Sequence, residues 1–337
     1  MGAERVEKLI ALRYRNEQGR ARDLLSLAEA ARGGLSVSSV EDLSGRRNST
    51  DIIDELDQNK MAGPLAARCE MRHVKAVIFD WAGTVVDYGS LAPMGAFVET
   101  FAEFGVEISI DEARGPMGMA KRPHIAALTA LPRIAQAWER RHGRAPTDAD
   151  IDALYEVFVP KNVAVAAAYA EIIPGVADVV KQLRAQGVKI GSSTGYTREI
   201  MAKITPRAAE QGFVPDSLVC TGDTSEGRPS PLMFYKGLLD LGVWPAWSAI
   251  KIDDTTVGVA EGVNAGAWSI GVAVSGNSFG LSLADTQALA PADFAARSAK
   301  AYATLSAAGA HYVIDSVADL MPVVAEIEGR LARGERP

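Results

Sequence analysis

Cysteine is scarce in this 337-residue chain, which contains only Cys69 and Cys220. The two allow at most one disulfide and stand in no metal-binding spacing, as is typical of a protein from a reducing cytoplasm. No apolar run approaches the roughly 18 residues that a membrane-spanning helix needs. The start of the chain carries Glu4 and Glu7 and lacks the long apolar core of a signal peptide. We therefore expect a cytoplasmic protein that does not act at a membrane.

Positive charge is also in deficit, with 35 basic against 42 acidic residues, a net charge of −7 and an isoelectric point near 5.3. This balance disfavours binding to nucleic acid or to an anionic membrane surface. The chain is 48% hydrophobic and 23% charged, as globular proteins are. Its length is sufficient for two ordinary domains.

Bulky apolar side chains are few in residues 1–70, where Tyr14 is the only aromatic. The stretch 35–51 is rich in turn-forming residues. Too little apolar surface is available there to build an independent core. We expect residues 1–70 to form a poorly ordered N-terminal extension, and a regulatory or docking arm is the alternative.

A regular alternation of strands and helices begins at Val74. The apolar run Val74–Phe79 predicts a buried strand, and residues 91–170 then show helical spacing without a clear strand. Helices and strands alternate over residues 171–330, which indicates βαβ units and a parallel sheet. The expected fold is α/β: a Rossmann-like parallel-sheet core from residues 71–90 and 171–330, with an inserted all-helical cap at 91–170. The later strands are expected within 188–195, 217–223, 249–255, 268–274 and 311–316.

Polar residues follow three of these strands at the edge where open α/β sheets bind ligands. Asp80 follows the first strand, the run Ser193–Gly195 ends the second, and Asp253 and Asp254 end a later one. Arg228 lies in a Pro/Gly loop between the last two. Each signal alone is weak, because acidic strand ends are often helix caps and loop arginines are usually solvated. Together they favour phosphoryl transfer.

Each of these residues has a candidate role in that chemistry. Asp80 is the expected nucleophile, which would form an aspartyl phosphate. Thr194 and the N–H of Gly195 are expected to bind phosphoryl oxygens, and Arg228 to stabilise the developing negative charge. Asp80 and Asp254 are expected to share a Mg²⁺ ion, which needs only one or two carboxylates together with water and substrate oxygens.

The motifs "FDWAGT", "SSTG", Arg228 and "IDDT" resemble, in this order, the four motifs of the haloacid dehalogenase superfamily. Within it, the chain resembles the phosphonatases over residues 74–317. The resemblance implies a haloacid dehalogenase core, a homodimer assembled through the cap, and hydrolysis of the P–C bond of phosphonoacetaldehyde in the breakdown of 2-aminoethylphosphonate. The blocks that carry it are "FDWAGTVVDYG", "ARGPMGMAK", "LTALPRIAQAW", "KIGSSTGYTREIM", "GRPSPLMFYK" and "EGVNAGAW".

Ala82 stands where many phosphate-transferring relatives carry a second aspartate, two residues after the first. Such an aspartate protonates the alkoxide that leaves a phosphate ester, so its absence argues against ester cleavage. A phosphonate releases a carbanion instead, and protonating an oxygen gives no help there. An electron sink next to the carbon is needed, and a lysine imine of an adjacent aldehyde provides one.

Lys121 in "PMGMAKRPH" is the candidate for this imine, and the resemblance implies that it forms the Schiff base. Met117 and Met119 can desolvate its amine and lower its pKa. His124 lies one helical turn on, where it either assists proton transfer or is a packed residue of the cap. Met117 and Tyr196 are expected to line the substrate pocket, although a tyrosine after a strand end is as often a packing residue.

The metal is expected to bind Asp80, the backbone oxygen of Ala82 and Asp254. One departure from the family pattern lies nearby. Some relatives read "GDTxxD" here, whereas this chain reads "DDTTVG", with Asp253 in place of the glycine and Gly258 in place of the last aspartate. Asp253 is therefore expected to hold neighbouring groups of the site in place or to cap the strand end. It is not expected to ligate the metal.

Two other functions were considered. A phosphatase or phosphoglucomutase of the same superfamily is disfavoured by the missing acid at Ala82. A non-catalytic phosphate sensor or scaffold would be expected to have lost part of the catalytic set. That set is complete in Asp80, Lys121, Thr194, Arg228 and Asp254.

Overall fold

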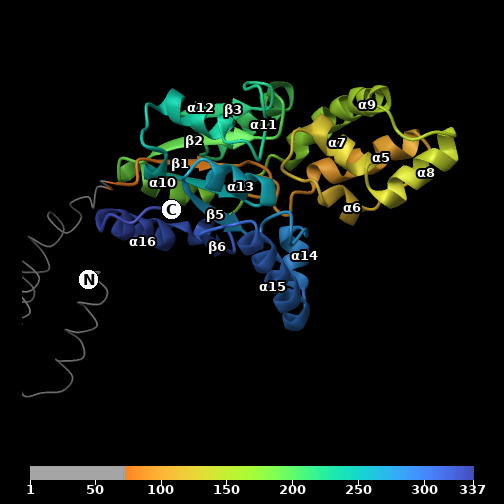
Figure 1. Cartoon of the computed structure of the whole chain (residues 1–337). Helices are drawn as coiled ribbons and strands as arrows, with labels where there is room; N and C mark the ends of the chain where they lie inside the picture. The colour runs from red at the N-terminus through yellow and green to blue at the C-terminus, as the bar shows by residue number, and fades with distance from the viewer. Residues whose placement is uncertain (1–70, 72) are drawn as a thin grey trace, which may run out of the picture. The chain divides into compact units, whose positions relative to one another are not determined.

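The computed structural model of the chain describes residue 71 and residues 73–337 (Figure 1). The expected N-terminal extension, residues 1–70, and Cys69 lie outside the described residues. Cys220 is a buried free thiol. Among the described residues, no helix is both long and apolar enough to cross a membrane.

The described part of the chain contains a six-stranded parallel sheet in the order β3-β2-β1-β4-β5-β6. This order places β1 at the centre, between β2 and β4, so that the strand ends predicted to carry chemistry are neighbours. The predicted α/β class with a parallel sheet is confirmed. The strands are β1 (Ala76–Phe79), β2 (Lys189–Thr194), β3 (Ser217–Cys220), β4 (Ala249–Asp253), β5 (Trp268–Val272) and β6 (Tyr312–Ile314).

Both faces of the sheet are buried, which explains the continuous apolar runs of its strands. In β1, Val77 and Phe79 join the cluster on one face, and Ala76 and Ile78 join the cluster on the other. One face packs against α10 (Val176–Ala185), α11 (Arg198–Glu210) and α16 (Leu320–Ala332). The other packs against α12 (Leu232–Leu241), α13 (Thr256–Asn264) and α15 (Pro291–Ala307).

Local signals set several helix boundaries. Thr197 caps α11, because its side chain accepts a hydrogen bond from Ile200 N. Thr147 precedes another helix, and the Asp150 carboxylate accepts from Thr147 N at 2.8 Å. The short helix α14 (Leu283–Ala288) was not predicted. Six residues are too few to show a helical period, and its main signal is the Ser282 cap.

A block of helices lies between β1 and β2, at one end of the sheet in Figure 1. It has its own hydrophobic core, built around buried aromatic residues such as Phe97, Trp138 and Phe158. We refer to residues 92–169 as the helical insertion. Its helices confirm the predicted all-helical block. Its elements are α5 (Ala92–Glu103), α6 (Ile110–Arg114), α7 (Lys121–Thr129), α8 (Pro132–His142), α9 (Asp148–Ala166) and η1 (Ala167–Tyr169).

The loop between α6 and α7 packs closely on the ends of the strands. Gly118 has φ +89°, and a Cβ there would lie 2.2 Å from Thr255 Oγ1, just beyond β4. A Cβ on Gly195, after β2, would lie 2.9 Å from the carbonyl oxygen of Met119. Only glycine allows such close approach at these two points. The helical insertion therefore closes over the sheet edge that carries the predicted site.

Candidate active site

Asp80 lies directly after the central strand β1 and is almost fully buried. Its backbone N–H donates to Ile252 O at 2.9 Å, which continues the ladder to β4 and fixes the direction of the residue. Its Oδ1 lies 2.7 Å from Arg228 Nη1. Burial, together with the nearby Asp253 carboxylate, raises the pKa of Asp80 to about 6. The Asp80 carboxyl group, which is the predicted nucleophile, is thus held in one direction. It is only partly protonated at neutral pH.

Thr194 and Gly195 lie at the end of β2, beside Asp80. Thr194 Oγ1 accepts a hydrogen bond from Tyr196 N at 3.1 Å, which leaves the hydroxyl proton free to donate. Asp80, Thr194, Gly195 and Arg228 line one pocket. The structure therefore brings together the groups that were predicted to bind phosphoryl oxygens.

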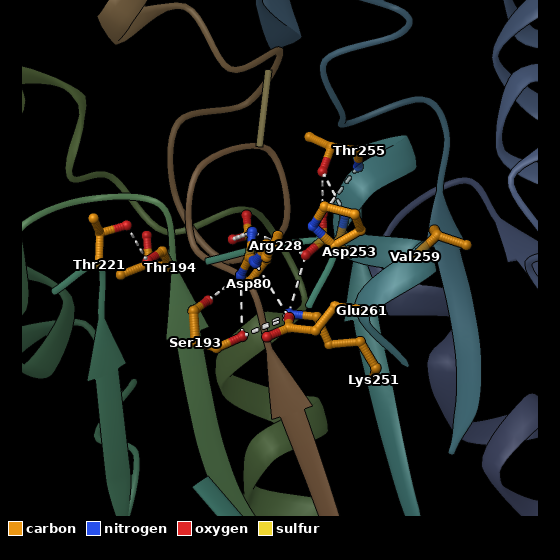
Figure 2. Close-up of polar contacts among 12 residues, drawn as sticks. Asp80, Ser193, Thr194, Thr221, Arg228, Lys251, Asp253, Thr255, Val259 and Glu261 are labelled. Atoms are coloured by element: carbon orange, nitrogen blue, oxygen red, sulfur yellow. Dashed lines mark hydrogen bonds and ion pairs between the residues drawn. The ribbon is translucent and has the colours of Figure 1, made fainter. Parts of the chain in front are cut away.

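Arg228 reaches the site from the loop after β3, and its side chain is 1% exposed. Besides Asp80, its guanidinium contacts Asp253 Oδ2 at 3.2 Å and Glu261 Oε2 at 3.1 Å, and it donates to the carbonyl oxygen of Ser193. Figure 2 shows these partners around the guanidinium. Because the Arg228 guanidinium is held at several points, its N–H donors keep fixed positions. Such donors are well suited to contacts with phosphoryl oxygens.

Lys251 and Glu261 belong to the same buried network, and the sequence analysis did not identify them. Lys251 Nζ lies 3.0 Å from Asp253 Oδ2, 3.1 Å from Glu261 Oε2 and 2.8 Å from Ser193 Oγ (Figure 2). Both side chains are fully buried. The signal that could have identified them was the lysine inside the otherwise apolar strand "AIKID". Because an unpaired buried lysine is very unfavourable, this lysine implied an acidic partner elsewhere in the chain.

The charges in this region favour a bound divalent cation. Arg228 and Lys251 are the cations, and the carboxylates are Asp80, Asp253, Asp254 and Glu261. With all six ionised, two positive and four negative charges leave a net charge of −2. A buried excess of this size is relieved by protonation of a carboxyl group or by a bound divalent metal ion.

The donor atoms also fit a metal ion. Carboxylate oxygens of Asp80, Asp253 and Asp254 lie within 4.8 Å of one another. Asp254 Oδ2 accepts from Asn277 N at 2.7 Å, whereas its buried Oδ1 has no hydrogen-bond partner in the part of the chain that the structure describes. Burial and the neighbouring Asp80 raise the pKa of Asp254 well above its usual value, so a cation is needed to keep this carboxyl ionised. Hard oxygen donors of this kind suit Mg²⁺.

Lys121 is the first residue of α7 and is 3% exposed. Its Nζ lies 4.9 Å from the ring centre of Tyr196 and 5.6 Å from that of Phe97, in the pocket that also contains Asp80 and Arg228. Burial lowers the pKa of this lysine to about 8. About a tenth of this amine is therefore neutral at pH 7, and imine formation requires the neutral form.

Replacing Lys121 by methionine is expected to stabilise the fold at neutral pH. Lowering the pKa from 10.5 to about 8 means that the fold disfavours the ammonium form. At about 1.4 kcal/mol per pKa unit, this costs about 3 kcal/mol below pH 8, and the cost fades as the pH rises from 8 to 10.5. Urea unfolding of Lys121→Met and wild type at pH 7 and pH 10 tests this. An equal difference at both pH values would contradict it.

His124 lies in the interior of the helical insertion. Its ring stacks on Phe97 with centroids 4.1 Å apart, and its Nε2 donates to Ala113 O at 2.8 Å. Burial lowers the pKa of His124 to about 3, so the ring is neutral. Its buried Nδ1, which has no hydrogen-bond partner among the described residues, is an acceptor. These contacts are those of a packed residue. Proton transfer by His124 stays a prediction.

Met117, Tyr196 and Ala82 line the pocket that contains Asp80 and Lys121. Ser90 is a pocket residue that the sequence analysis missed. Its φ is +52°, and its buried Oγ has no hydrogen-bond partner among the described residues. A non-glycine residue in this conformation is uncommon and is often found at functional sites. No sequence pattern distinguished this serine from others in turns.

Comparisons with known proteins identify the family of the chain. Residues 74–266 match the family model of haloacid dehalogenase-like hydrolases. The chain is 72% identical over 267 residues to a phosphonoacetaldehyde hydrolase of Paraburkholderia xenovorans (strain LB400). This match covers 79% of this chain and all of the relative. The chain belongs to the phosphonoacetaldehyde hydrolase family.

More distant members of the phosphonoacetaldehyde hydrolase family match a similar share of the chain. The Klebsiella pneumoniae phosphonoacetaldehyde hydrolase is 48% identical over 269 residues, covering 79% of this chain and all of the relative. A crystal structure of a phosphonoacetaldehyde hydrolase-like protein from Oleispira antarctica is 45% identical, with a TM-score of 0.77, and covers 79% of this chain and 96% of that chain. The predicted superfamily and the assignment as a hydrolase are confirmed.

Proposed function

We propose that this chain hydrolyses the P–C bond of phosphonoacetaldehyde to give acetaldehyde and phosphate. The observation that carries the proposal is a buried amine of lowered pKa, Lys121, in one pocket with the carboxylate of Asp80. Ala82 lines the same pocket and offers no acid for an alkoxide leaving group. The relatives named for this activity support the same substrate.

The first step activates the carbon side of the scissile bond. The neutral Lys121 amine attacks the aldehyde carbon, and uptake of one proton from solvent with loss of water gives a protonated imine. The aromatic rings of Tyr196 and Phe97 lie near Lys121 Nζ, and their faces offset part of the cost of burying the iminium cation. The iminium can then accept the electron pair of the adjacent P–C bond.

The second step transfers the phosphoryl group. An Asp80 oxygen attacks phosphorus, the P–C bond breaks, and its electron pair forms the enamine on Lys121. Arg228, the Thr194 hydroxyl and the Gly195 N–H bind the phosphoryl oxygens as negative charge develops. The products of the step are an aspartyl phosphate and an enamine.

The remaining steps return the enzyme to its starting state. Protonation of the enamine carbon gives an imine of acetaldehyde, and water hydrolyses it to acetaldehyde and free Lys121. A second water hydrolyses the aspartyl phosphate to free phosphate and Asp80. A Mg²⁺ ion, for which Asp80, Asp254 and the backbone oxygen of Ala82 are the proposed ligands, would neutralise charge on the phosphoryl group.

Further parts of the proposal follow from the resemblance to phosphonatases. His124 would transfer protons during imine formation, and Met117 and Tyr196 would shape the pocket. The chain would form a homodimer through the helical insertion. It would be a cytoplasmic enzyme of 2-aminoethylphosphonate breakdown.

The direct test is release of acetaldehyde from phosphonoacetaldehyde, measured with Mg²⁺ and again with a chelator. We expect release with Mg²⁺ and loss of release with the chelator. A simple phosphate monoester serves as the comparison substrate and is expected to be hydrolysed far more slowly, because Ala82 provides no general acid. Efficient hydrolysis of the ester by a protein that leaves phosphonoacetaldehyde intact would instead identify a phosphatase.

The pH dependence of kcat/KM is expected to report the Lys121 amine of the free enzyme. Only the neutral amine attacks the aldehyde, and the pKa of Lys121 is lowered to about 8. Activity at low substrate concentration should therefore rise about tenfold per pH unit below pH 8 and level off above it. A profile that is flat between pH 6 and pH 8 would exclude this lysine as the titrating nucleophile.

A further inference from the structure

Gly258, in the first turn of α13, faces the carboxyl group of Asp253 at the end of β4. A Cβ at position 258 would lie 1.9 Å from Asp253 Cγ and 2.0 and 2.1 Å from the two carboxylate oxygens. Real Cβ atoms essentially never approach another atom within 3.0 Å. Gly258 does not have a positive φ, so this glycine is required for space and not for its backbone conformation. The Asp253 carboxylate fills the volume that a side chain at 258 would need.

The contacts of Asp253 are with cations and with its own turn. Its Oδ2 lies 3.0 Å from Lys251 Nζ and 3.2 Å from Arg228 Nη1. Its Oδ1 accepts from Thr255 N at 3.0 Å and from Thr255 Oγ1 at 2.7 Å. The side chain is completely buried. Although Asp253 belongs to the acidic cluster with Asp80 and Asp254, its carboxylate is thus already engaged from both sides (Figure 2).

We propose that Asp253 is a positioning residue that holds the Arg228 guanidinium beside Asp80, and that Gly258 is its obligatory steric partner. The inference rests on the proposed function, in which Arg228 binds phosphoryl oxygens. Asp253 acts through Arg228 and Lys251 and does not ligate the metal.

The geometry also makes positions 253 and 258 interdependent. A carboxylate can enter this volume from the strand, as it does here, or from the helix if position 253 has no side chain. It cannot enter from both, because the second side chain would overlap the first. Exchanging the two residues should therefore be tolerated better than changing position 258 alone.

The test uses Asp253→Asn, Asp253→Gly, Gly258→Asp and the double variant Asp253→Gly/Gly258→Asp in the full chain. Melting temperature, calorimetric binding of inorganic phosphate in the presence of Mg²⁺, and the kcat and KM for phosphonoacetaldehyde are measured for each. The Mg²⁺ concentration that gives half-maximal activity is measured for Asp253→Asn. Phosphate replaces the substrate wherever a reading without turnover is needed.

Asp253→Asn keeps the shape and removes the charge that holds Arg228. We expect it to stay folded, to lose about 10- to 100-fold in phosphate affinity and kcat/KM, and to keep the wild-type Mg²⁺ requirement. Gly258→Asp should have a much lower melting temperature than wild type. The double variant should recover most of that loss and bind phosphate more tightly than Asp253→Gly.

Two results would overturn the inference. If Asp253→Asn raises the Mg²⁺ requirement while phosphate affinity is unchanged, Asp253 is a metal ligand. If the double variant is no more stable than Gly258→Asp, the two positions do not share one volume. Melting and phosphate binding need no turnover, so wild-type inactivity on phosphonoacetaldehyde would contradict the proposed function without affecting these readings.

Discussion

Lys121→Arg is expected to abolish acetaldehyde release from phosphonoacetaldehyde, with a loss of roughly 10³-fold or more in kcat. Arginine keeps the positive charge in the pocket but is never deprotonated in a protein, so it cannot form the imine that accepts the P–C electron pair. Without this electron sink the leaving group would be an unstabilised carbanion. The measurement is a coupled assay that reduces the acetaldehyde product.

A matched control separates lost chemistry from lost structure. The proposed phosphoryl-binding groups Thr194, Gly195 and Arg228 come from the sheet core and not from α7. Lys121→Arg should therefore still bind inorganic phosphate with nearly wild-type affinity. If the variant retains substantial acetaldehyde release, the imine mechanism through this lysine is wrong.

Asp80→Asn is expected to stop cleavage with a loss of similar size, roughly 10³-fold or more in kcat, for a different reason. The amide is nearly isosteric but is a very poor nucleophile toward phosphorus, so no aspartyl phosphate forms. Imine formation on Lys121 precedes this step and should survive. The expected result is a folded protein that condenses with the aldehyde and releases neither acetaldehyde nor phosphate.

The accompanying control is a stability measurement. Asp80 is a buried partner of Arg228 at 2.7 Å, so the substitution removes one charge from a network that retains Asp253 and Glu261 around the guanidinium. We expect cooperative unfolding to persist. Acetaldehyde release at a wild-type rate from Asp80→Asn would show that another group attacks phosphorus.

The sequence was sufficient to predict the fold and the residues that line its edge. Buried parallel strands are continuous apolar runs, and this made the strands just before Asp80 and Asp254 recognisable. Polar residues that follow such strands indicate where a ligand binds. The helical insertion was recognisable from its long stretch of helical spacing. Lys121 was identified through chemical need and resemblance, and the structure places it in the pocket with Asp80.

The buried ion network could not be predicted in the same way. Glu261, in a helix, contacts Arg228 and Ser193. Lys251, in a strand, contacts Glu261 and Ser193, so the network depends on how four separate segments pack. The same is true of Gly258, whose importance appears only when its distance to Asp253 is known. Sequence patterns report periodicity along one element, whereas these contacts join residues that are distant in the chain.

The helical insertion and the metal region are linked by contacts that no motif revealed. Arg114, at the end of α6, donates to Gly89 O at 2.9 Å, to Gly280 O at 3.0 Å and to Asn277 Oδ1 at 3.1 Å. The backbone N–H of Asn277 in turn donates to Asp254 Oδ2. One side chain of the insertion thus touches the loop that orients a proposed metal ligand.

The most direct test of the central claim is reduction of the proposed imine. Wild-type protein, the Asp80→Asn variant and Lys121→Arg are each mixed with phosphonoacetaldehyde and treated with borohydride, and the peptides are then analysed by mass spectrometry. We predict a covalent adduct on the peptide that contains Lys121 in wild type and in Asp80→Asn, and no adduct at position 121 in Lys121→Arg. The absence of an adduct on Lys121 in a wild-type sample that is turning over substrate would contradict the account.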